Sequence, residues 1–119
     1  KAAAPLVRIV ALRLADRTPI CVGTTWLPAD RFPNAGQVYE RVRSMTKVLA
    51  HFDVRDYRRA STRVSAGIVE AADAARLDLA LGRPVLIVDS TDVDASDKPL
   101  MTTHARFAAE RVEFLVENS

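Results

Sequence analysis

Apolar residues come in short runs along the chain, and most of these runs are bounded by turn-forming residues. The first run, VRIVALRL, is followed by the polar stretch ADRTP and then by a second run, ICVGTTWL. Two apolar runs separated by a short polar turn predict a β-hairpin. The same pattern along the rest of the chain predicts six β-strands in all, over residues 7–14, 20–27, 57–68, 84–93, 99–107 and 111–117.

Two segments have helical rather than strand periodicity. The apolar positions from residue 36 to residue 52 follow the spacing of one helical face, which predicts a single helix; they are Val38, Val42, Met45, Leu49 and Phe52. The stretch EAADAARLDLAL predicts a second helix over residues 70–81, with acidic residues near its start and Gly82 as its C-cap.

The predicted order of elements is β-β-α-β-α-β-β-β. Hairpins dominate this order, so we expect an α+β fold, a mainly antiparallel β-sheet with flanking helices. With 119 residues the chain has the size of one domain, and we expect residues 1–119 to form it.

A weak internal repeat adds to this picture. The segment PICVGTTWLPADRF (residues 19–32) aligns with PLMTTHARFAAERV (residues 99–112), and each copy follows an apolar strand and a polar turn. A repeated strand–turn–strand unit predicts a pseudo-symmetric sheet. Chance, together with features common to all hairpins, is the alternative explanation, and the sequence leaves both open.

Composition and charge narrow the classes of function. Lys and Arg total 17 and Asp and Glu 15, and this net charge of +2 does not indicate nucleic-acid binding by the chain itself. A single cysteine, Cys21, excludes a disulfide within one chain and fits a reduced cytoplasm. No apolar run approaches the length of a membrane span. The start, KAAAPLVRIV, has neither an initiator Met nor a signal peptide, so we expect a domain of a longer protein.

The most distinctive segment is YRRASTRVSA, which concentrates arginine and hydroxyl side chains in a predicted strand. Strand alternation predicts that Arg58 and Thr62 share the more apolar, inward face, whereas Arg59 and Arg63 point outward. Arginine binds carboxylates and phosphates through paired hydrogen bonds, and a buried arginine needs an acid or an anionic ligand.

An alternative role for these arginines is purely structural. They would then form salt bridges on a solvated face, with Asp53, Asp56 or Glu70 as partners. The segment alone leaves both interpretations open.

A second group of candidate ligand-binding residues lies on the predicted strand 99–107. His104 and Arg106 share one face of this strand, and Thr24 and Trp26 lie on the corresponding strand of the first repeat. A pocket between the two hairpins would therefore be lined by these four residues. A structural role for the histidine and core packing for the tryptophan are the alternatives.

The sequence contains no motif typical of a catalytic or cofactor site. It has no nucleophile elbow, no phosphate-binding loop and no dinucleotide-binding glycine pattern, so we expect no cofactor and no catalytic residue. No metal site is expected either, because the acids of residues 89–97 lack the ligand pattern of a calcium loop. We interpret Asp89, Asp92, Asp94 and Asp97 as turn and edge-strand acids, and Cys21 as a core thiol.

Taken in order, these segments resemble the UTRA domain, the effector-binding half of GntR-type bacterial transcription regulators of the HutC group. The resemblance covers roughly residues 6–118. It is carried by ADRTPI, by WLPADRFP, by the strand RRASTRVSA, by AADAARLDLALGRPVL and by the closing DKPLMTTHARFAAERVEFLVE.

Within that group, RRASTRVSA is most similar to PhnF-type regulators of phosphonate uptake and breakdown. The resemblance implies a chorismate-lyase-like fold, a small anionic effector, a homodimer and an upstream winged helix-turn-helix domain, through which alone DNA would be contacted. This sequence lacks that domain and the strand and helix expected before residue 5. Arg58, Arg59, Thr62 and Arg63 match the motif directly, whereas His104 and Arg106 match only by their place on a late strand.

We therefore expect a cytoplasmic, effector-sensing domain that binds a phosphonate- or phosphate-type anion and is not an enzyme. Arg58, Arg59, Thr62, Arg63, Trp26, His104 and Arg106 are the candidate ligand-binding residues. One alternative is a lyase or transferase on the same fold, acting on an anionic aromatic acid. The other is a dimerisation module with a vestigial pocket.

Overall fold

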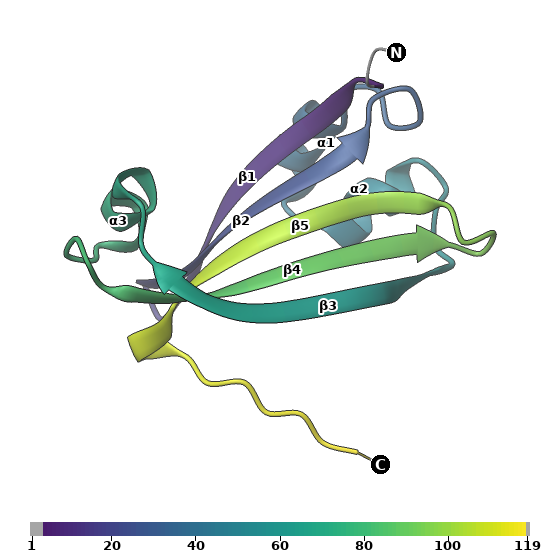
Figure 1. Ribbon diagram of the computed structural model, residues 1–119. Coiled ribbons are helices and arrows are strands. Elements are labelled where there is room, and N and C mark those ends of the chain that lie inside the picture. Colours follow the sequence, from purple (N-terminus) through teal and green to yellow (C-terminus); the bar gives the residue numbers. More distant parts are fainter. Residues whose placement is uncertain (1–3, 119) are drawn as a thin grey trace.

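The computed structural model describes residues 4–118, which form a five-stranded antiparallel sheet with helices on both faces (Figure 1). The strands are β1 (Leu6–Ala15), β2 (Thr18–Pro28), β3 (Tyr57–Ile68), β4 (Pro84–Asp94) and β5 (Pro99–Ala108), in the spatial order β1-β2-β5-β4-β3. This architecture confirms the predicted α+β fold. Within residues 4–118, no helix has both the length and the apolar character needed to cross a membrane.

The two hairpins that carry the internal repeat lie side by side in the sheet. Strands β2 and β5 pair at its centre, and Thr24 lies directly opposite His104. These two positions are also equivalent in the sequence repeat, so the hairpins are related by an approximate two-fold axis at this pair. This is the pseudo-symmetric arrangement that the repeat predicts.

The single helix predicted over residues 36–52 is wrong, because two shorter helices occupy this segment. They are α1 (Ala35–Val42) and α2 (Met45–His51). Arg43 has a left-handed conformation with φ 56°, and the Ser44 side chain accepts a hydrogen bond from the Lys47 amide at 3.3 Å. A serine N-cap can start a new helix, so the chain turns while its apolar spacing stays helical.

The second predicted helix is shorter than the sequence indicated. Helix α3 (Ala71–Leu77) ends at Asp78, which is left-handed with φ 52°, and not at Gly82. The guanidinium of Arg111 donates to the carbonyls of Leu77 at 2.6 Å and Asp78 at 2.9 Å. A side chain from far along the chain therefore satisfies this helix end, which no local pattern could show.

The strand predicted over residues 111–117 is also wrong. A short 3₁₀ helix, η1 (Ala109–Arg111), follows β5, and residues 112–118 then leave the sheet without pairing to it (Figure 1). The segment has the composition of a strand, but a strand forms only where a neighbour offers hydrogen bonds. We call residues 112–118 the C-terminal arm.

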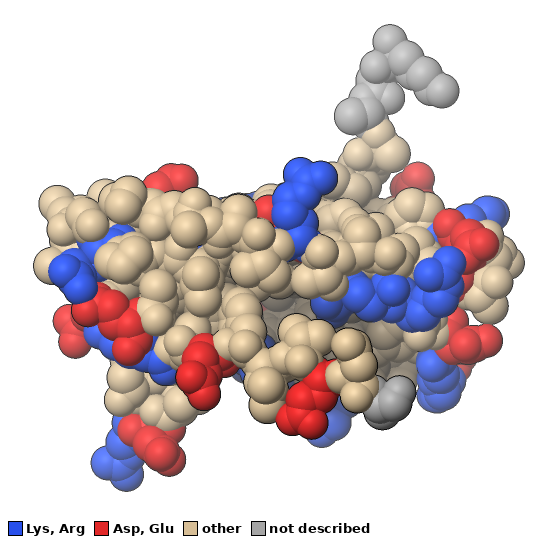
Figure 2. Space-filling view, turned by 60° about the horizontal axis from the view of Figure 1, so that its bottom comes forward, with Lys and Arg blue, Asp and Glu red and all other residues tan. Residues whose placement is uncertain are grey.

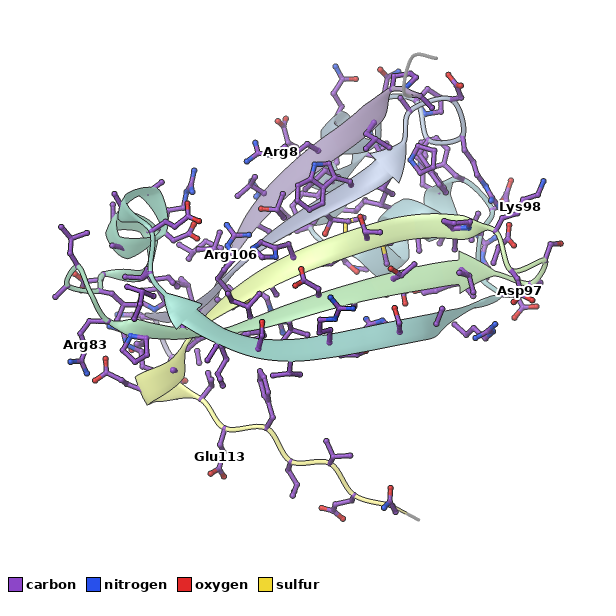
Figure 3. The ribbon with its side chains drawn as sticks, viewed as in Figure 1. Arg8, Arg83, Asp97, Lys98, Arg106 and Glu113 are labelled. Carbon is purple, nitrogen blue, oxygen red and sulfur yellow. The ribbon has the colours of Figure 1, made fainter. Side chains whose placement is uncertain are left out.

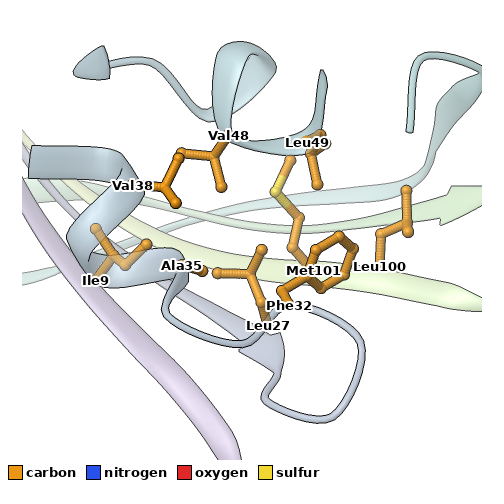
Figure 4. Close-up of a cluster of buried hydrophobic side chains, with 9 residues drawn as sticks. All are labelled: Ile9, Leu27, Phe32, Ala35, Val38, Val48, Leu49, Leu100 and Met101. Atoms are coloured by element: carbon orange, nitrogen blue, oxygen red, sulfur yellow. The ribbon is translucent and has the colours of Figure 1, made fainter. Parts of the chain in front are cut away.

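Two apolar clusters hold helices against opposite faces of the sheet. Adjacent residues of β1 show this directly, because Ile9 packs into the cluster under α1 and α2, whereas Val10 packs against the cluster under α3. Figure 4 shows the larger cluster, formed by Ile9, Leu27, Phe32, Ala35, Val38, Val48, Leu49, Leu100 and Met101. The smaller cluster contains Val22, Val69, Ala74, Leu77 and Val85. Strands β1 and β2 thus send side chains into both layers, with Ile9 and Leu27 in the larger cluster and Val10 and Val22 at the smaller one.

Candidate functional site

The face of the sheet beneath α3 carries a row of polar side chains that crosses four strands. Residues directly opposite each other on antiparallel strands point to the same face. Arg63 on β3 lies opposite Asp89, Asp89 opposite His104, and His104 opposite Thr24. We call this surface the α3 face. A neighbouring row on it contains Ser61, Thr91, Thr102, Trp26 and Arg8.

Two adjoining clefts open on the α3 face. One, of about 290 Å³, lies between α3 and the sheet and is lined by Thr24, Trp26, His104 and Arg106 among others. The other, of about 440 Å³, reaches Arg63 and the hydroxyls of the neighbouring row. Trp26 and His104 line both clefts. The four residues that the repeat assigned to a pocket between the hairpins therefore come together on one surface.

Arg106 ties this surface to α3. Its guanidinium donates to both carboxylate oxygens of Asp73, at 2.8 and 3.0 Å, and to Thr24 Oγ1 at 2.8 Å. The side chains of Arg106 and Asp73 are each 11% exposed. The hydrogen bonds from Arg106 hold the pKa of the Asp73 carboxyl below its usual value, although burial acts in the opposite direction. Because Asp73 already compensates the charge of Arg106, we infer that the main role of Arg106 is to hold α3 against the sheet.

His104 is held by an acid from the neighbouring strand. Its Nδ1 lies 2.6 Å from Asp89 Oδ1, and both side chains are half-exposed. A partner at Nδ1 fixes the orientation of the ring and leaves Nε2 as the nitrogen that can contact a ligand. The pair therefore presents one directed polar atom to both clefts.

Two further cations on the α3 face have no ion pair in the described part of the chain, residues 4–118. They are Arg63 on β3 and Arg8 on β1, and both are exposed. Figure 3 shows Arg8 and Arg106 on strands of the same half of the molecule as α3. Uncompensated guanidinium groups beside hydroxyl donors are suited to an anionic ligand.

The bulge in β3 changes which of the predicted arginines reach this face. The register of β3 with β4 shifts between Arg59 and Ser61, so alternation is broken there. Arg59 donates to Asp92 Oδ1 at 2.8 Å and to Thr62 Oγ1 at 3.4 Å, which places both residues on the face opposite α3. The prediction that Arg58 and Thr62 share one face is therefore wrong. Arg63, which was predicted to point outward, is exposed, and it lines the cleft of about 440 Å³.

Arg58 lies far from both clefts. It pairs with Asp97 at 2.6 Å, and the two side chains are 62% and 73% exposed. Asp97 lies in the β4–β5 turn, at the opposite end of the sheet from α3 (Figure 3). Arg58 and Arg59 do form salt bridges, but not with the predicted acids. Of the four motif residues, Arg63 and Thr62 border the cleft of about 440 Å³, whereas Arg58 and Arg59 border neither cleft of the α3 face.

The sequence alone did not predict several residues of the site. Asp89 and Asp92 were predicted as turn or edge-strand acids, but both lie within β4, which is flanked by β3 and β5. Alternation within that strand was the signal that could have placed Asp89 beside His104. Asp73 and Arg76 of α3 carry no such signal, because only the packing of the helix brings them to the cleft.

Residues 4–118 contain neither a cluster of metal-ligating side chains nor an exposed thiol. No group of three or more His, Cys, Asp or Glu side chains in residues 4–118 is placed to hold a metal ion. Cys21 is 1% exposed, and burial raises the pKa of its thiol. This confirms the prediction of a core thiol.

Comparison with known proteins assigns a family to this fold. Residues 1–113 match the UTRA domain family. An HTH-type transcriptional regulator of Rhizobium meliloti strain 1021, RB1450, is 31% identical over 113 residues. That alignment covers 95% of this chain and 46% of the regulator, so the chain spans about half the length of this curated relative.

Solved structures agree in fold. The C-terminal domain of YurK from Bacillus subtilis subsp. subtilis str. 168 superposes with a TM-score of 0.89 at 19% identity, covering 98% of this chain and 80% of that one. The effector domain of PhnF from Mycobacterium smegmatis gives 0.88 at 18% identity, covering 100% and 74%. The chain belongs to the UTRA domain family, as its sequence motifs indicated.

Proposed function

We propose that this chain is the effector-sensing domain of a bacterial transcription regulator of the GntR family, HutC group, and that its α3 face binds a small anion of phosphonate or phosphate type. The observation that carries the proposal is the pair of cleft-side cations, Arg63 and Arg8, which have no acidic partner within residues 4–118. Membership of the UTRA family and the similarity to an HTH-type regulator support a sensing role.

Each group on the α3 face has a defined part in this proposal. Arg63 donates to the anion from β3, and the hydroxyls of Ser61, Thr91 and Thr102 supply further donors beside it. His104 contributes Nε2, and Trp26 provides an apolar wall for the remainder of the ligand. Arg106 holds α3 in place through Asp73 and completes the cleft.

The same proposal extends to the location, the oligomeric state and the DNA contact of the whole regulator. The regulator would act in the cytoplasm as a homodimer, and it would contact DNA only through a winged helix-turn-helix domain outside this sequence. On the face shown in Figure 2, blue and red side chains lie around a largely uncharged, hollowed centre. Binding of the effector to one arrangement of the domain would bias the DNA-binding domain by linkage.

The test is thermal unfolding of the chain at fixed ionic strength with phosphate, sulfate, methylphosphonate, 2-aminoethylphosphonate, a sugar phosphate and a chloride control. A ligand that binds only the folded state stabilises it by about 2.7 kcal/mol at a hundredfold excess over Kd. We expect a selective rise in Tm with one phosphonate or phosphate ester. Equal small shifts with every anion would count against the proposal.

The structure provides a matched pair of variants for this experiment. Arg63→Gln removes a cation from the α3 face, whereas Arg58→Gln removes one from the same strand at the far end of the sheet. We expect the ligand-dependent shift to disappear in the first variant and to persist in the second. Loss in Arg58→Gln alone would place the anion elsewhere.

An enzyme acting on an anionic aromatic acid is a second candidate, favoured by one observation. The contact of 2.6 Å between His104 and Asp89 at the cleft resembles a histidine oriented by a carboxylate for proton transfer. Turnover assays with such acids distinguish the two, because a sensor binds its ligand without consuming it. Product formation that is lost in His104→Gln would favour the enzyme.

A further inference from the structure

Arg8 lies apart from Arg63 on the α3 face. It belongs to β1 at one edge of the sheet, whereas Arg63 belongs to β3 at the other edge (Figures 1 and 3). Arg8 lines the cleft of about 290 Å³ between α3 and the sheet, which we call the helix cleft. Arg63 lines the cleft of about 440 Å³, which we call the hydroxyl cleft. The two unpaired arginines therefore belong to different clefts.

The sheet holds these two arginines far from each other. In the strand order β1-β2-β5-β4-β3 they are four strand spacings apart, which is about 19 Å between the outer strands. Because side chains stand roughly perpendicular to a sheet, this separation is too large for both guanidinium groups to bind one phosphonate. An effector that uses both arginines must therefore be elongated, with a charged group at each end.

The surface between the two arginines is continuous. Trp26 on β2 and His104 on β5 line both clefts, and Trp26 lies directly opposite Arg8 in the pairing of β1 with β2. The helix cleft also has apolar walls, formed by Ile68, Val69, Ala72, Val85 and Ile87. An apolar linker between the two ends of an effector would contact the indole and these walls.

Several charged side chains of the two clefts already have partners in the protein. In the hydroxyl cleft, Asp89 contacts His104 at 2.6 Å. In the helix cleft, Asp73 pairs with Arg106 at 2.8 Å and with Arg76 at 3.3 Å. A ligand would have to displace these contacts to use any of the five groups.

Three charged side chains of the clefts have no ion pair with any residue of the range 4–118, namely Arg63, Arg8 and Glu70. Arg8 and Glu70 line the helix cleft together, from β1 and from the residue before α3. Opposite charges that share a cleft without contacting each other leave room for a ligand group that carries both. An α-amino acid end has these charges, because its carboxylate suits an arginine and its ammonium group suits a glutamate.

We propose that the helix cleft binds the α-amino acid end of the effector, while its phosphonate or phosphate end lies at Arg63. The carboxylate accepts hydrogen bonds from Arg8, the ammonium group donates to Glu70, and the linker crosses Trp26. The effector class is therefore an α-amino acid with a terminal phosphonate or phosphate group. This inference rests on the anion site of the proposed function and adds a second recognition site to it.

The first test is isothermal titration calorimetry of the chain with three matched series of phosphonates. The first series contains the α-amino-ω-phosphono derivatives of butyric, pentanoic, hexanoic and heptanoic acid. The second series lacks the amino group, and the third lacks the carboxylate. We expect one chain length to bind best, and loss of either group to raise Kd by about tenfold or more at that length. O-phosphoserine and O-phosphohomoserine distinguish a phosphate ester from a phosphonate.

Two substitutions connect each ligand group to its partner in the protein. Arg8→Gln should raise the Kd of the amino acid ligand by about tenfold and leave the Kd of the ligand without a carboxylate unchanged. Glu70→Gln should likewise weaken the amino acid ligand and leave the ligand without an amino group unchanged. Both side chains are exposed, and the Glu70 side chain does not cap α3, so both variants should stay folded. Circular dichroism verifies this.

Matched controls come from the other side of the sheet. Arg13→Gln removes an arginine from the same strand, β1, where it lines the groove beside α1 and α2. Glu40→Gln removes an exposed acid from α1. Neither residue lines a cleft of the α3 face, so both variants should leave Kd unchanged. A loss of affinity in Arg13→Gln that Arg8→Gln does not show would place the ligand on the other face and overturn the proposal.

The remaining outcomes separate this inference from the proposed function. If simple alkylphosphonates bind through Arg63, and neither the amino group nor the carboxylate improves affinity at any chain length, the amino acid end is overturned and the anion site stands. If no phosphonate or phosphate ester binds, both are overturned together. Equal weakening of all three series by Arg8→Gln would indicate a general loss of positive charge, and it would also overturn the amino acid end.

Discussion

Asp73 on α3 and Arg106 on β5 hold each other through two hydrogen bonds, of 2.8 and 3.0 Å, and each side chain is 11% exposed. Asp73 also forms an ion pair within α3, with Arg76 at 3.3 Å. The side chain of Arg76 is 46% exposed, so this second ion pair is less buried than the first. The buried pair therefore fixes the position of α3 over the cleft, and its two members depend on each other for compensation of charge.

The first prediction concerns the removal of one member of this pair. Asp73→Asn keeps the size of the side chain but leaves the buried guanidinium of Arg106 without its counter-charge, so we expect a loss of about 3 kcal/mol in the free energy of unfolding. Urea unfolding at fixed protein concentration measures it. The control is Asp97→Asn, which breaks the exposed pair with Arg58 and should cost less than about 1 kcal/mol. Equal losses in both variants would contradict this account.

The second prediction concerns pH. Because the folded state lowers the pKa of Asp73 below its usual value, the folded protein binds this proton less readily than the unfolded chain does. Its contribution to stability is therefore fully present above the usual carboxyl pKa of about 4 and is lost as pH falls through the lower, folded value.

Urea unfolding of the parent chain and of Asp73→Asn at a series of pH values from neutral to about 3 tests this sign. The difference between the two free energies should be constant near neutral pH and should shrink in acid. The pKa values of Asp94 and Glu110 are also lowered, by hydrogen bonds from Arg31 and Arg83, but these acids are present in both proteins and cancel in the difference. If the difference between the two free energies of unfolding grew in acid, this prediction would be contradicted.

The third prediction compares one substitution at two positions. Leu49 of α2 is 0% exposed within the larger apolar cluster, and Leu81 in the turn before β4 is 73% exposed. Leu49→Ala should cost about 3 kcal/mol of stability, through lost burial and the cavity left behind. Leu81→Ala should stay within about 0.5 kcal/mol of the parent. Thermal or urea unfolding of the two variants measures the contrast.

The fourth prediction tests the break between α1 and α2. The Ser44 side chain accepts a hydrogen bond from the Lys47 amide and so caps the start of α2. Ser44→Ala should therefore reduce stability by about 1 kcal/mol. Ser96→Ala, in the exposed turn between β4 and β5, serves as the control and should change stability by less than about 0.5 kcal/mol. If Ser44→Ala were neutral, the cap would not explain where the second helix begins.

Part of the candidate site followed from strand alternation. The repeat aligned Thr24 with His104, and alternation put Trp26 and Arg106 on the same faces as these two, which is how the structure arranges them around the cleft. The prediction succeeded because the pairing of residues 21–26 of β2 with residues 102–107 of β5 has no register shift, so alternation holds where these four residues lie. It failed in β3, where one bulge places Arg59 and Arg63, which were predicted to share a face, on opposite faces of the sheet.

The sequence by itself determined the five sheet strands, the α+β class and the family, since these rest on periodicity, turn residues and motif order. Only the tertiary structure decided where helices end, which acids meet which arginines and whether the last segment pairs. Arg111 caps α3 from 33 residues away, Asp73 meets Arg106 across the same separation, and the arm stays outside the sheet. Contacts between distant residues depend on packing, and no local pattern of apolar and polar residues encodes them.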